Sequence, residues 1–285
     1  MANCSVSPAL TLEPLAADQR PLVDLRSPQA FVQGHPLGAT NIPLEELPLA
    51  WHELPPKGAR LELLVNQADA EQAQRIFEQQ QYAIEQIRIA EQQDQASWLA
   101  NNVSQRLWRA NPLLEHYIEL IKQHIHSSSP VAFDIGCGSG RDALFLALHG
   151  FKVLGLDNNP FALERLEQFK RRWNANLSAK IVDFQTQRIA LVELIEQQQP
   201  SLVVQARYLH RPLLDDFYQY LPAGSILAIH TFLEAAAKFG KPKNPAYLLK
   251  NNELAEKFKG WDLLINQEHR LDDGRPLSLF LAKKP

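Results

Sequence analysis

The sequence predicts an α/β protein made of two domains, on three observations. The chain has 285 residues, and one domain per roughly 150 residues gives about two domains. From residue 130 onwards, short apolar runs alternate with segments of helical periodicity, which is typical of a parallel sheet with crossover helices. A separate set of strand and helix patterns occupies residues 10–92.

The composition indicates a globular protein without disulfide or metal staples. Hydrophobic residues make up 45% and charged residues 21% of the chain, which is ordinary for a soluble domain. Apolar runs such as Leu277–Leu281 are far shorter than the roughly 20 residues that span a bilayer, and the first residues lack a secretory pattern. Two cysteines, Cys4 and Cys137, are too few for a disulfide framework or a four-ligand metal site. We expect a cytoplasmic protein with no membrane partner.

The charge is distributed unevenly between the two halves. The formal net charge of −3 divides into −7 for residues 1–105 and +4 for residues 106–285. Opposite signs suggest two units that attract each other. The positive charge of the second half is too small and too scattered to indicate nucleic-acid binding. The sequence leaves open whether the protein forms a homodimer.

The second half predicts about seven strands and four helices in alternation. The Asn158-Asn159-Pro160 run offers an N-cap followed by proline in the first turn, so a helix is expected from there to about Arg172. The other expected helices are Arg141–His149, Leu214–Tyr220 and Asn252–Phe258. The expected strands are Val131–Ile135, Lys152–Leu156, Lys180–Val182, Leu202–Gln205, Ser225–His230, Asp262–Gln267 and Pro276–Ala282.

A glycine-rich run, Asp134–Gly140, joins the first of these strands to its helix. Glycines at that point let the backbone turn sharply and approach a ligand closely. The second strand ends at Asp157, 19 residues after Gly138, where a carboxylate can accept two hydrogen bonds from a ribose diol. The dinucleotide fingerprint would need a third glycine at position 141, where this chain has Arg141.

The pattern G-x-G-x-G, preceded by Asp134 and followed by Asp157, resembles motif I of the class I S-adenosylmethionine-dependent methyltransferases. The resemblance spans roughly residues 110–285 and implies a Rossmann-like domain with seven strands and S-adenosylmethionine as cofactor. A nicotinamide enzyme and an ordinary glycine turn are the alternatives. The residues that the resemblance assigns to the cofactor are Asp134, Gly136, Cys137, Gly138, Gly140, Asp157, Asn158, Asp183, Phe184 and Arg207. Because Cys137 lies inside this loop and no histidine base stands near it in the sequence, we expect it to pack rather than to act as a nucleophile.

The segment Gln205–Pro212 follows the fourth strand, and in this fold it lies beside the transferable methyl group. It contains Tyr208, His210 and Arg211, which are the expected catalytic residues and suit an anionic or polar acceptor. The alternative is that Arg207 or Arg211 pairs with Asp215 or Asp216 on the next helix. His230, at the end of the fifth strand, is a weaker candidate base, and the loop 239–247 could close over the site. These runs resemble the branch of class I enzymes related to tellurite-resistance methyltransferases.

Residues 21–43 resemble the opening of a rhodanese domain. A strand ends in Asp24-Leu25-Arg26, Ser27 caps a short helix, and Gly-His-x-x-Gly-Ala-x-Asn-Ile-Pro follows. The resemblance covers residues 10–92, with Arg60–Val65 as the next strand and Asp69–Gln80 as the next helix. It implies a cysteine just after that strand, but the chain has Asn66-Gln67-Ala68-Asp69 there. We expect no sulfur transfer, and Cys4 is a poor substitute for the missing thiol.

These arguments combine into one hypothesis. Residues 1–95 form an inactive rhodanese-like domain with a structural or regulatory role, and residues 96–285 form the methyltransferase domain, with a helix beginning in 92–107 at the junction. The substrate is a small-molecule methyl acceptor that is anionic or carries a soft nucleophile. The alternative is a protein that binds S-adenosylmethionine as a sensor without catalysis.

Overall fold

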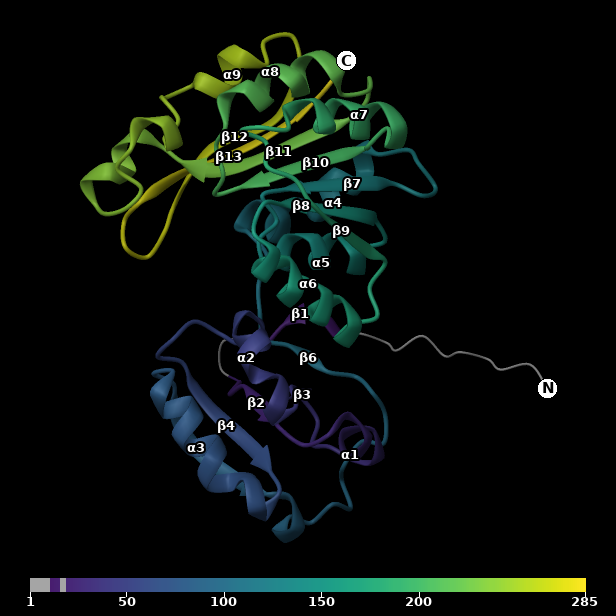
Figure 1. Cartoon of the computed structure of the whole chain (residues 1–285), viewed down its shortest axis with the longest axis vertical. Coiled ribbons are helices and arrows are strands. Elements are labelled where there is room, and N and C mark those ends of the chain that lie inside the picture. The colour runs from purple at the N-terminus through teal and green to yellow at the C-terminus, as the bar shows by residue number, and fades with distance from the viewer. Residues whose placement is uncertain (1–10, 16–18) are drawn as a thin grey trace, which may run out of the picture. The chain divides into compact units, whose positions relative to one another are not determined.

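The structure is a computed structural model, and it describes residues 11–15 and 19–285. Cys4 lies outside the described residues. The chain divides into two compact units after Arg109, whereas the sequence analysis placed the boundary after residue 95 (Figure 1). The expected helix at the junction does not form. Instead, Asp94 and Asn101 side chains accept hydrogen bonds from backbone N–H groups two residues ahead, a local pairing that competes with helix formation.

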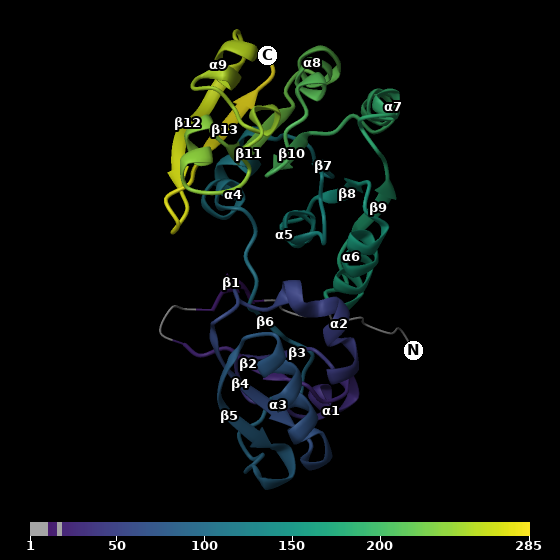
Figure 2. The same cartoon turned by 60° about the vertical axis from the view of Figure 1, so that its left-hand side comes forward.

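The N-terminal unit contains a four-stranded parallel sheet in the order β3-β2-β4-β5 (Figure 2). Helices α2 and α3 cover one face, through Leu47 and Phe77, and α1 covers part of the other through Phe31. A separate parallel pair joins β1 and β6. The strands are β1 (Thr11–Pro14), β2 (Leu22–Asp24), β3 (Ala39–Asn41), β4 (Arg60–Val65), β5 (Ala83–Ile89) and β6 (Gln105–Arg106). The helices are α1 (Pro28–Gln33), α2 (Leu47–Ala50) and α3 (Ala70–Gln79).

Local interactions explain the start of this unit. The Ser27 hydroxyl accepts a hydrogen bond from the N–H of Ala30, which confirms the expected N-cap of α1. The guanidinium of Arg26 binds the buried carboxylate of Asp24 with two hydrogen bonds, at 2.9 and 2.6 Å, and it also lies over the ring of Trp98. Both charges are therefore paired where they are removed from water.

The C-terminal unit contains a seven-stranded sheet in the order β12-β13-β11-β10-β7-β8-β9. All neighbouring strands are parallel except at β13, which is antiparallel to both β11 and β12. The sheet is therefore mixed rather than parallel throughout. The strands are β7 (Val131–Ile135), β8 (Lys152–Asp157), β9 (Leu177–Ile181), β10 (Leu202–Ala206), β11 (Ile226–Phe232), β12 (Asp262–Arg270) and β13 (Pro276–Lys283).

Helices cover both faces of this sheet (Figure 1). One face packs against α7, α8 and α9, whose apolar side chains share a core with Ile135, Val203 and Phe280. The helices of the C-terminal unit are α4 (Pro112–His124), α5 (Arg141–Leu148), α6 (Pro160–Arg172), α7 (Arg188–Gln198), α8 (Arg211–Tyr220) and α9 (Glu253–Lys257). No helix within residues 11–15 and 19–285 is long and apolar enough to cross a membrane.

The expected elements of this unit are present, with shifted ends. Helix α6 begins after the N-cap Asn159, as expected. Helix α8 begins at Arg211 rather than Leu214, because Pro212 is well suited to a first turn. The sequence analysis did not predict α4 or α7. Apolar side chains lie on several sides of α7, from exposed Ile189 to buried Ile195, so it lacks the one-sided pattern that marks a surface helix.

Candidate functional site

The site is built on the loop Gly136–Gly140, which leaves the carboxyl end of β7 and opens α5. Gly136 has φ +74° and Gly140 has φ +85°, a region that residues with a Cβ rarely adopt. A Cβ on Gly136 would lie 3.0 Å from the side chain of Tyr208, and one on Gly140 would lie 2.6 Å from Leu166. Both the backbone conformation and the close packing therefore require glycine at positions 136 and 140.

Asp157 ties the end of β8 to this loop. Its carboxylate accepts hydrogen bonds from the backbone N–H of Gly138 and of Asn159, both at 2.8 Å. Each carboxylate oxygen can accept more than one hydrogen bond, so Asp157 can still bind a diol. Asn158, next to it, is exposed.

Cys137 packs inside the loop. Its Sγ lies 3.0 Å from where a Cβ on Gly155 of β8 would stand, and the residue is buried. Burial raises the pKa of the Cys137 thiol well above its ordinary value, and the charges of Asp134 and Asp157 raise it further. The thiol is therefore protonated, which agrees with a packing role and not with a reactive thiolate.

Two carboxyl groups stand beside the loop, the buried Asp134 on β7 and the half-buried Asp142 on α5. Burial raises the pKa of Asp134 well above its ordinary value, and the charge of Asp142 raises it further. Burial also raises the pKa of Asp142, although Asn111 donates two hydrogen bonds to it at 2.7 and 2.8 Å. Oδ2 of Asp134 has no hydrogen-bond partner among the described residues. Asp134 was expected at the site from the sequence, whereas Asp142 was not.

Tyr208 connects the loop to the end of β9. Its side chain fits against Gly136, and its ring centroid lies 6.5 Å from that of Phe184. Burial raises the pKa of the Tyr208 hydroxyl, and the charges of Asp183 and Asp157 raise it further. The structure therefore brings together Gly136, Asp157, Asp183, Phe184 and Tyr208.

Arg207 follows β10 directly and has φ +53°, an uncommon conformation for a residue with a side chain. Its N–H donates to the carbonyl of His230 at 2.7 Å. Its side chain is exposed. Its charge opposes the rise that burial causes in the pKa of Asp142 and adds to the fall that burial causes in the pKa of His230. Arg207 thus lies between the glycine loop and the end of β11.

Arg211 has a different set of contacts from the one expected. Its guanidinium binds Glu253 at 2.6 and 2.9 Å and also donates to the carbonyls of Ala246 and Leu248. The expected pairing of Arg211 with Asp215 or Asp216 is wrong. Lys257 pairs with Asp215, and Arg188 pairs with Asp216. Arg211 holds the end of the loop 239–247 against α9, and this contact could not be anticipated because Glu253 is 42 residues away.

His210 is half-buried at the start of α8. Its side chain makes no capping hydrogen bond to the helix, although its carbonyl accepts the N–H of Leu213 at 3.0 Å. It stands two residues after Tyr208 in the sequence, and within residues 11–15 and 19–285 its side chain makes no hydrogen bond or ion pair with the glycine loop.

The loop after β4 in the N-terminal unit is closed by its own neighbours. The carboxylate of Glu91 accepts a hydrogen bond from the N–H of Gln67 at 3.1 Å. The Asn66 amide donates to Asp69 at 2.9 Å. The Glu91 carboxylate thus already accepts the Gln67 N–H, which a pocket for an anion would need as a free donor.

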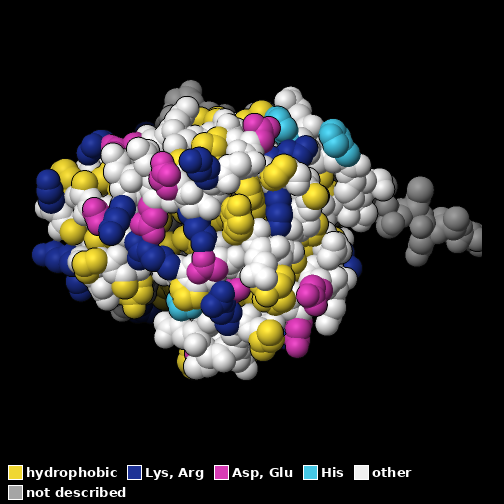
Figure 3. Space-filling view, turned by 90° about the horizontal axis from the view of Figure 1, so that it is seen from above, with side chains coloured by type: hydrophobic (Ala, Val, Ile, Leu, Met, Phe, Trp, Pro, Cys, Tyr) yellow, Lys and Arg dark blue, Asp and Glu magenta, His cyan; other side chains and the backbone are white. Residues whose placement is uncertain are grey.

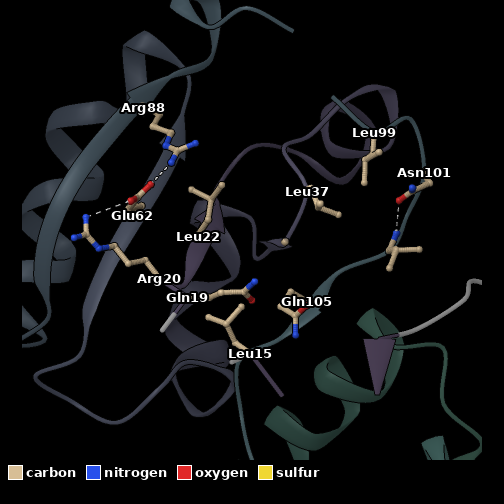
Figure 4. Close-up of a pocket in the computed structure, with 12 residues that line it drawn as sticks. Leu15, Gln19, Arg20, Leu22, Leu37, Glu62, Arg88, Leu99, Asn101 and Gln105 are labelled. Carbon is tan, nitrogen blue, oxygen red and sulfur yellow. Dashed lines mark hydrogen bonds and ion pairs between the residues drawn. The ribbon is translucent and has the colours of Figure 1, made fainter. Parts of the chain in front are cut away.

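The N-terminal unit also contains a cavity of about 710 Å³. Figure 4 shows Glu62 between Arg20 and Arg88 at its wall, with Leu22 and Leu37 among its apolar lining. Glu62 pairs with Arg88, and Arg20 lies 3.9 Å from it. Both arginines therefore neutralise a carboxylate that is largely buried.

The sheet order and the glycine loop define the C-terminal unit as a Rossmann-like methyltransferase domain of the class that uses S-adenosylmethionine. The family described as "Tellurite resistance protein TehB" matches residues 116–273, more than half of the chain. The chain belongs to this family.

Individual proteins share between 22% and 27% sequence identity with this chain. The "Probable S-adenosyl-L-methionine-dependent methyltransferase TehB" of Haemophilus influenzae is 25% identical over 142 residues, covering 48% of this chain and 47% of that protein. "Hemagglutinin 1" of Eikenella corrodens is 27% identical over 177 residues, 58% of each chain. The crystal structure of TehB from Haemophilus influenzae has a TM-score of 0.47 and 22% identity, covering 60% of this chain and 62% of that one. The chain spans about half the length of the curated relatives that it matches.

Proposed function

We propose that this protein transfers the methyl group of S-adenosylmethionine to a small acceptor that is anionic or offers a soft nucleophile. The observation that carries the proposal is the link between Gly138 and Asp157 at 2.8 Å. This link supports the proposal because a carboxylate that could hold a ribose lies against a glycine loop at the carboxyl ends of parallel strands, where ligands of such sheets bind. Membership of the TehB family supports the same activity.

The residues present fit the cofactor. The carboxylate of Asp157 would hold the ribose, and Asn158 and Phe184 would flank the adenine ring, with Asp183 beside its amino group. The space at Gly138 is open, since a Cβ there would have no atom within 4 Å. Asp134 has an oxygen without a partner among the described residues, which would suit the ammonium group of the methionine end. When bound, the cofactor supplies an electrophilic methyl group.

On the acceptor side, the protein's task is alignment, because methyl transfer is an in-line displacement that needs orientation and exclusion of water. Tyr208 and His210 would contact the acceptor, and Arg207 would bind an anionic group of the acceptor or the cofactor carboxylate. Because the guanidinium of Arg211 is committed to Glu253 and two carbonyls, we assign it to positioning the loop 239–247.

We further propose that about residues 1–95, within the N-terminal unit, form a rhodanese-like domain without sulfurtransferase activity. The sequence resemblance of residues 21–43 supports the assignment, and the parallel sheet is compatible with it. Loss of the thiol is supported by Asn66–Asp69 in place of a cysteine and by Glu91 on the N–H of Gln67. Its role would be structural or regulatory.

The proposed partner is a small molecule, in a cytoplasmic protein that could form a homodimer. On the face seen in Figure 3, Lys and Arg side chains are interspersed with acidic and apolar ones, whereas nucleic-acid binding favours a clustered basic surface.

Calorimetric titration of the full chain with S-adenosylmethionine tests the proposal first. Saturable binding, followed by S-adenosylhomocysteine formation with at least one acceptor from a panel of thiols, small acids and selenite, is the expected result. Absence of binding would refute it. Binding with no product from any acceptor would favour the sensor role instead.

A further inference from the structure

His230 on β11 is a buried imidazole whose ring nitrogens make no hydrogen bond to any described residue. Its exposed fraction is 0%, and neither Nδ1 nor Nε2 has a hydrogen-bond partner within residues 11–15 and 19–285. A buried polar atom without a hydrogen bond destabilises the fold, so a ring with two such atoms is unusual in a protein core.

Strand register places this ring on the same face of the sheet as Asp134. His230 is opposite Ala206 of β10, and Asp134 is opposite Val204, two residues earlier on the same strand. Residues two apart in a strand point to the same side. That side is opposite to the face covered by α7, α8 and α9, whose core takes the alternate residues Val203 and Ile229.

A second histidine stands next to His230. His269 of β12 pairs with Leu277, and Leu277 is two residues from Leu279, the partner of His230. The two ring centroids are 5.6 Å apart, and Nδ1 of His269 also lacks a partner in the described part of the chain. Both imidazoles lie near the carboxyl ends of their strands, at the edge of the sheet that holds Arg207.

The surrounding groups define what could bind there. Arg207 is the neighbouring cation, and its own N–H is bound to the carbonyl of His230. From α4, the Tyr117 hydroxyl donates a hydrogen bond to the Gln267 side chain at 3.3 Å. Burial lowers the pKa of His269, and the charge of His116, also on α4, lowers it further. No three His, Cys, Asp or Glu side chains among the described residues are placed to hold a metal ion.

The protonation state narrows the ligand chemistry. Burial, with the charges of Arg207 and His269, lowers the pKa of His230 to about 3, so the ring is neutral near pH 7. A neutral imidazole has one N–H donor and one acceptor nitrogen. A bare anion can bind only an N–H donor and a cation only an acceptor nitrogen. A hydroxyl or a neutral amine can do both, by donating to a ring nitrogen of one histidine and accepting from the N–H of the other, whose ring centroid is 5.6 Å away.

We propose that His230, with His269 beside it, binds the methyl acceptor, and that the acceptor presents a hydroxyl or amine to this pair. The proposal rests on the methyltransferase function above and narrows its substrate class. A carboxylate or phosphate elsewhere on the acceptor would meet Arg207. The acceptor is then a small hydroxy or amino acid, or a phosphate ester of similar size.

The ¹⁵N chemical shifts of the His230 ring nitrogens test directly whether an acceptor binds there. The protein is first saturated with S-adenosylhomocysteine and then titrated with three small acids: 4-hydroxybenzoate, 4-aminobenzoate and lactate. The O- or N-methylated form of each acid is the matched control, and 4-mercaptobenzoate is the thiol comparison. The ¹⁵N signals of His230 are assigned by their loss in His230→Gln. We expect a hydroxyl or amine compound to shift them and its methylated counterpart not to.

Kinetics provide the second measurement. We expect His230→Leu to lower kcat/KM for the responding acceptor at least tenfold, while the Kd for S-adenosylmethionine changes less than twofold. His230→Gln, which retains a donor and an acceptor, should recover part of the loss. His126→Leu is the control, since His126 is exposed in the loop before β7, at the opposite edge of the sheet.

Several results would overturn the proposal. These are no shift of the His230 signals with any hydroxyl or amine compound, methylation of thiols alone, or an unchanged kcat/KM in His230→Leu. In each case, retained binding of S-adenosylmethionine by the wild type would leave the proposed function standing. Loss of that binding would remove both.

Discussion

The carboxylate of Asp157 accepts a hydrogen bond from the backbone N–H of Gly138 at 2.8 Å, across 19 residues of sequence. The same carboxylate accepts the N–H of Asn159 at 2.8 Å. One side chain thus fixes the glycine loop to the end of the neighbouring strand, so the loop geometry and the proposed ribose contact depend on the same residue.

Replacing Asp157 should weaken cofactor binding. We expect Asp157→Ala to raise the Kd for S-adenosylmethionine at least tenfold, because charge-assisted hydrogen bonds contribute about 1.5–3 kcal/mol. Calorimetry gives the Kd. Asp262→Ala is the control, because Asp262 is exposed at the amino end of β12. An unchanged Kd in Asp157→Ala would contradict the assignment.

Gly140 should tolerate no side chain. Its φ of +85° and the 2.6 Å approach of Leu166 combine backbone strain with overpacking, so Gly140→Ala should lower the free energy of unfolding by about 2–4 kcal/mol. Gly150 has φ +93° but open space, and Gly150→Ala should cost only about 1–2 kcal/mol. Urea denaturation measures both. Equal costs would show that the contact with Leu166 contributes nothing.

Asp134 should make stability depend on pH. Because its pKa is raised in the folded protein, the folded state holds the proton more tightly than the unfolded state, and this contribution is lost as pH rises through the folded value. Asp134→Asn removes the titrating carboxyl group, and with it this decrease of stability with rising pH. The variant should gain stability relative to the wild type as pH rises from the ordinary value of 3.8 toward the raised folded pKa, by at most about 1.4 kcal/mol per pH unit, in urea titrations at each pH. A difference that stays constant with pH would be evidence against this.

His230 should act in the opposite direction. Its folded pKa of about 3 lies below the ordinary value of 6.5, so the unfolded chain binds the extra proton between these values. Stability should therefore fall as pH decreases below 6.5, by at most about 1.4 kcal/mol per pH unit. Denaturation of His230→Leu at pH 5 and pH 7 should show a smaller decline than the wild type, whereas the exposed His126→Leu should match the wild type.

Arg211 should stabilise the loop that precedes α9. Removing its guanidinium takes the Arg211 hydrogen bonds away from Glu253 and two carbonyls and leaves Glu253 with the N–H of Lys250. Arg211→Ala should therefore cost about 1–3 kcal/mol and speed proteolysis within residues 239–247. Arg60→Ala removes the surface pair with Glu85 and should cost less than about 1 kcal/mol. Unchanged protection of the loop in Arg211→Ala would contradict the positioning role.

The strands and the glycine loop were predictable because their signals are local. Val131–Ile135 is apolar except for Asp134, Asp134–Gly140 has fixed spacing, and Ser27 and Asn159 cap their helices through neighbours in sequence. Helix α7 was missed because its apolar residues do not form one stripe. The antiparallel direction of β13 was missed because strand direction is set by connection geometry, which no residue pattern encodes.

The sequence by itself determined the alternation of strands and helices, the glycine turn and the absence of a cysteine after β4. The tertiary structure decided which side chains meet: Arg211 with Glu253 rather than with Asp215, Glu91 with the N–H of Gln67, and His230 with His269. Local conformation depends on residues a few positions apart. These contacts join residues 24 to 42 positions apart, and the register and order of the strands determine them.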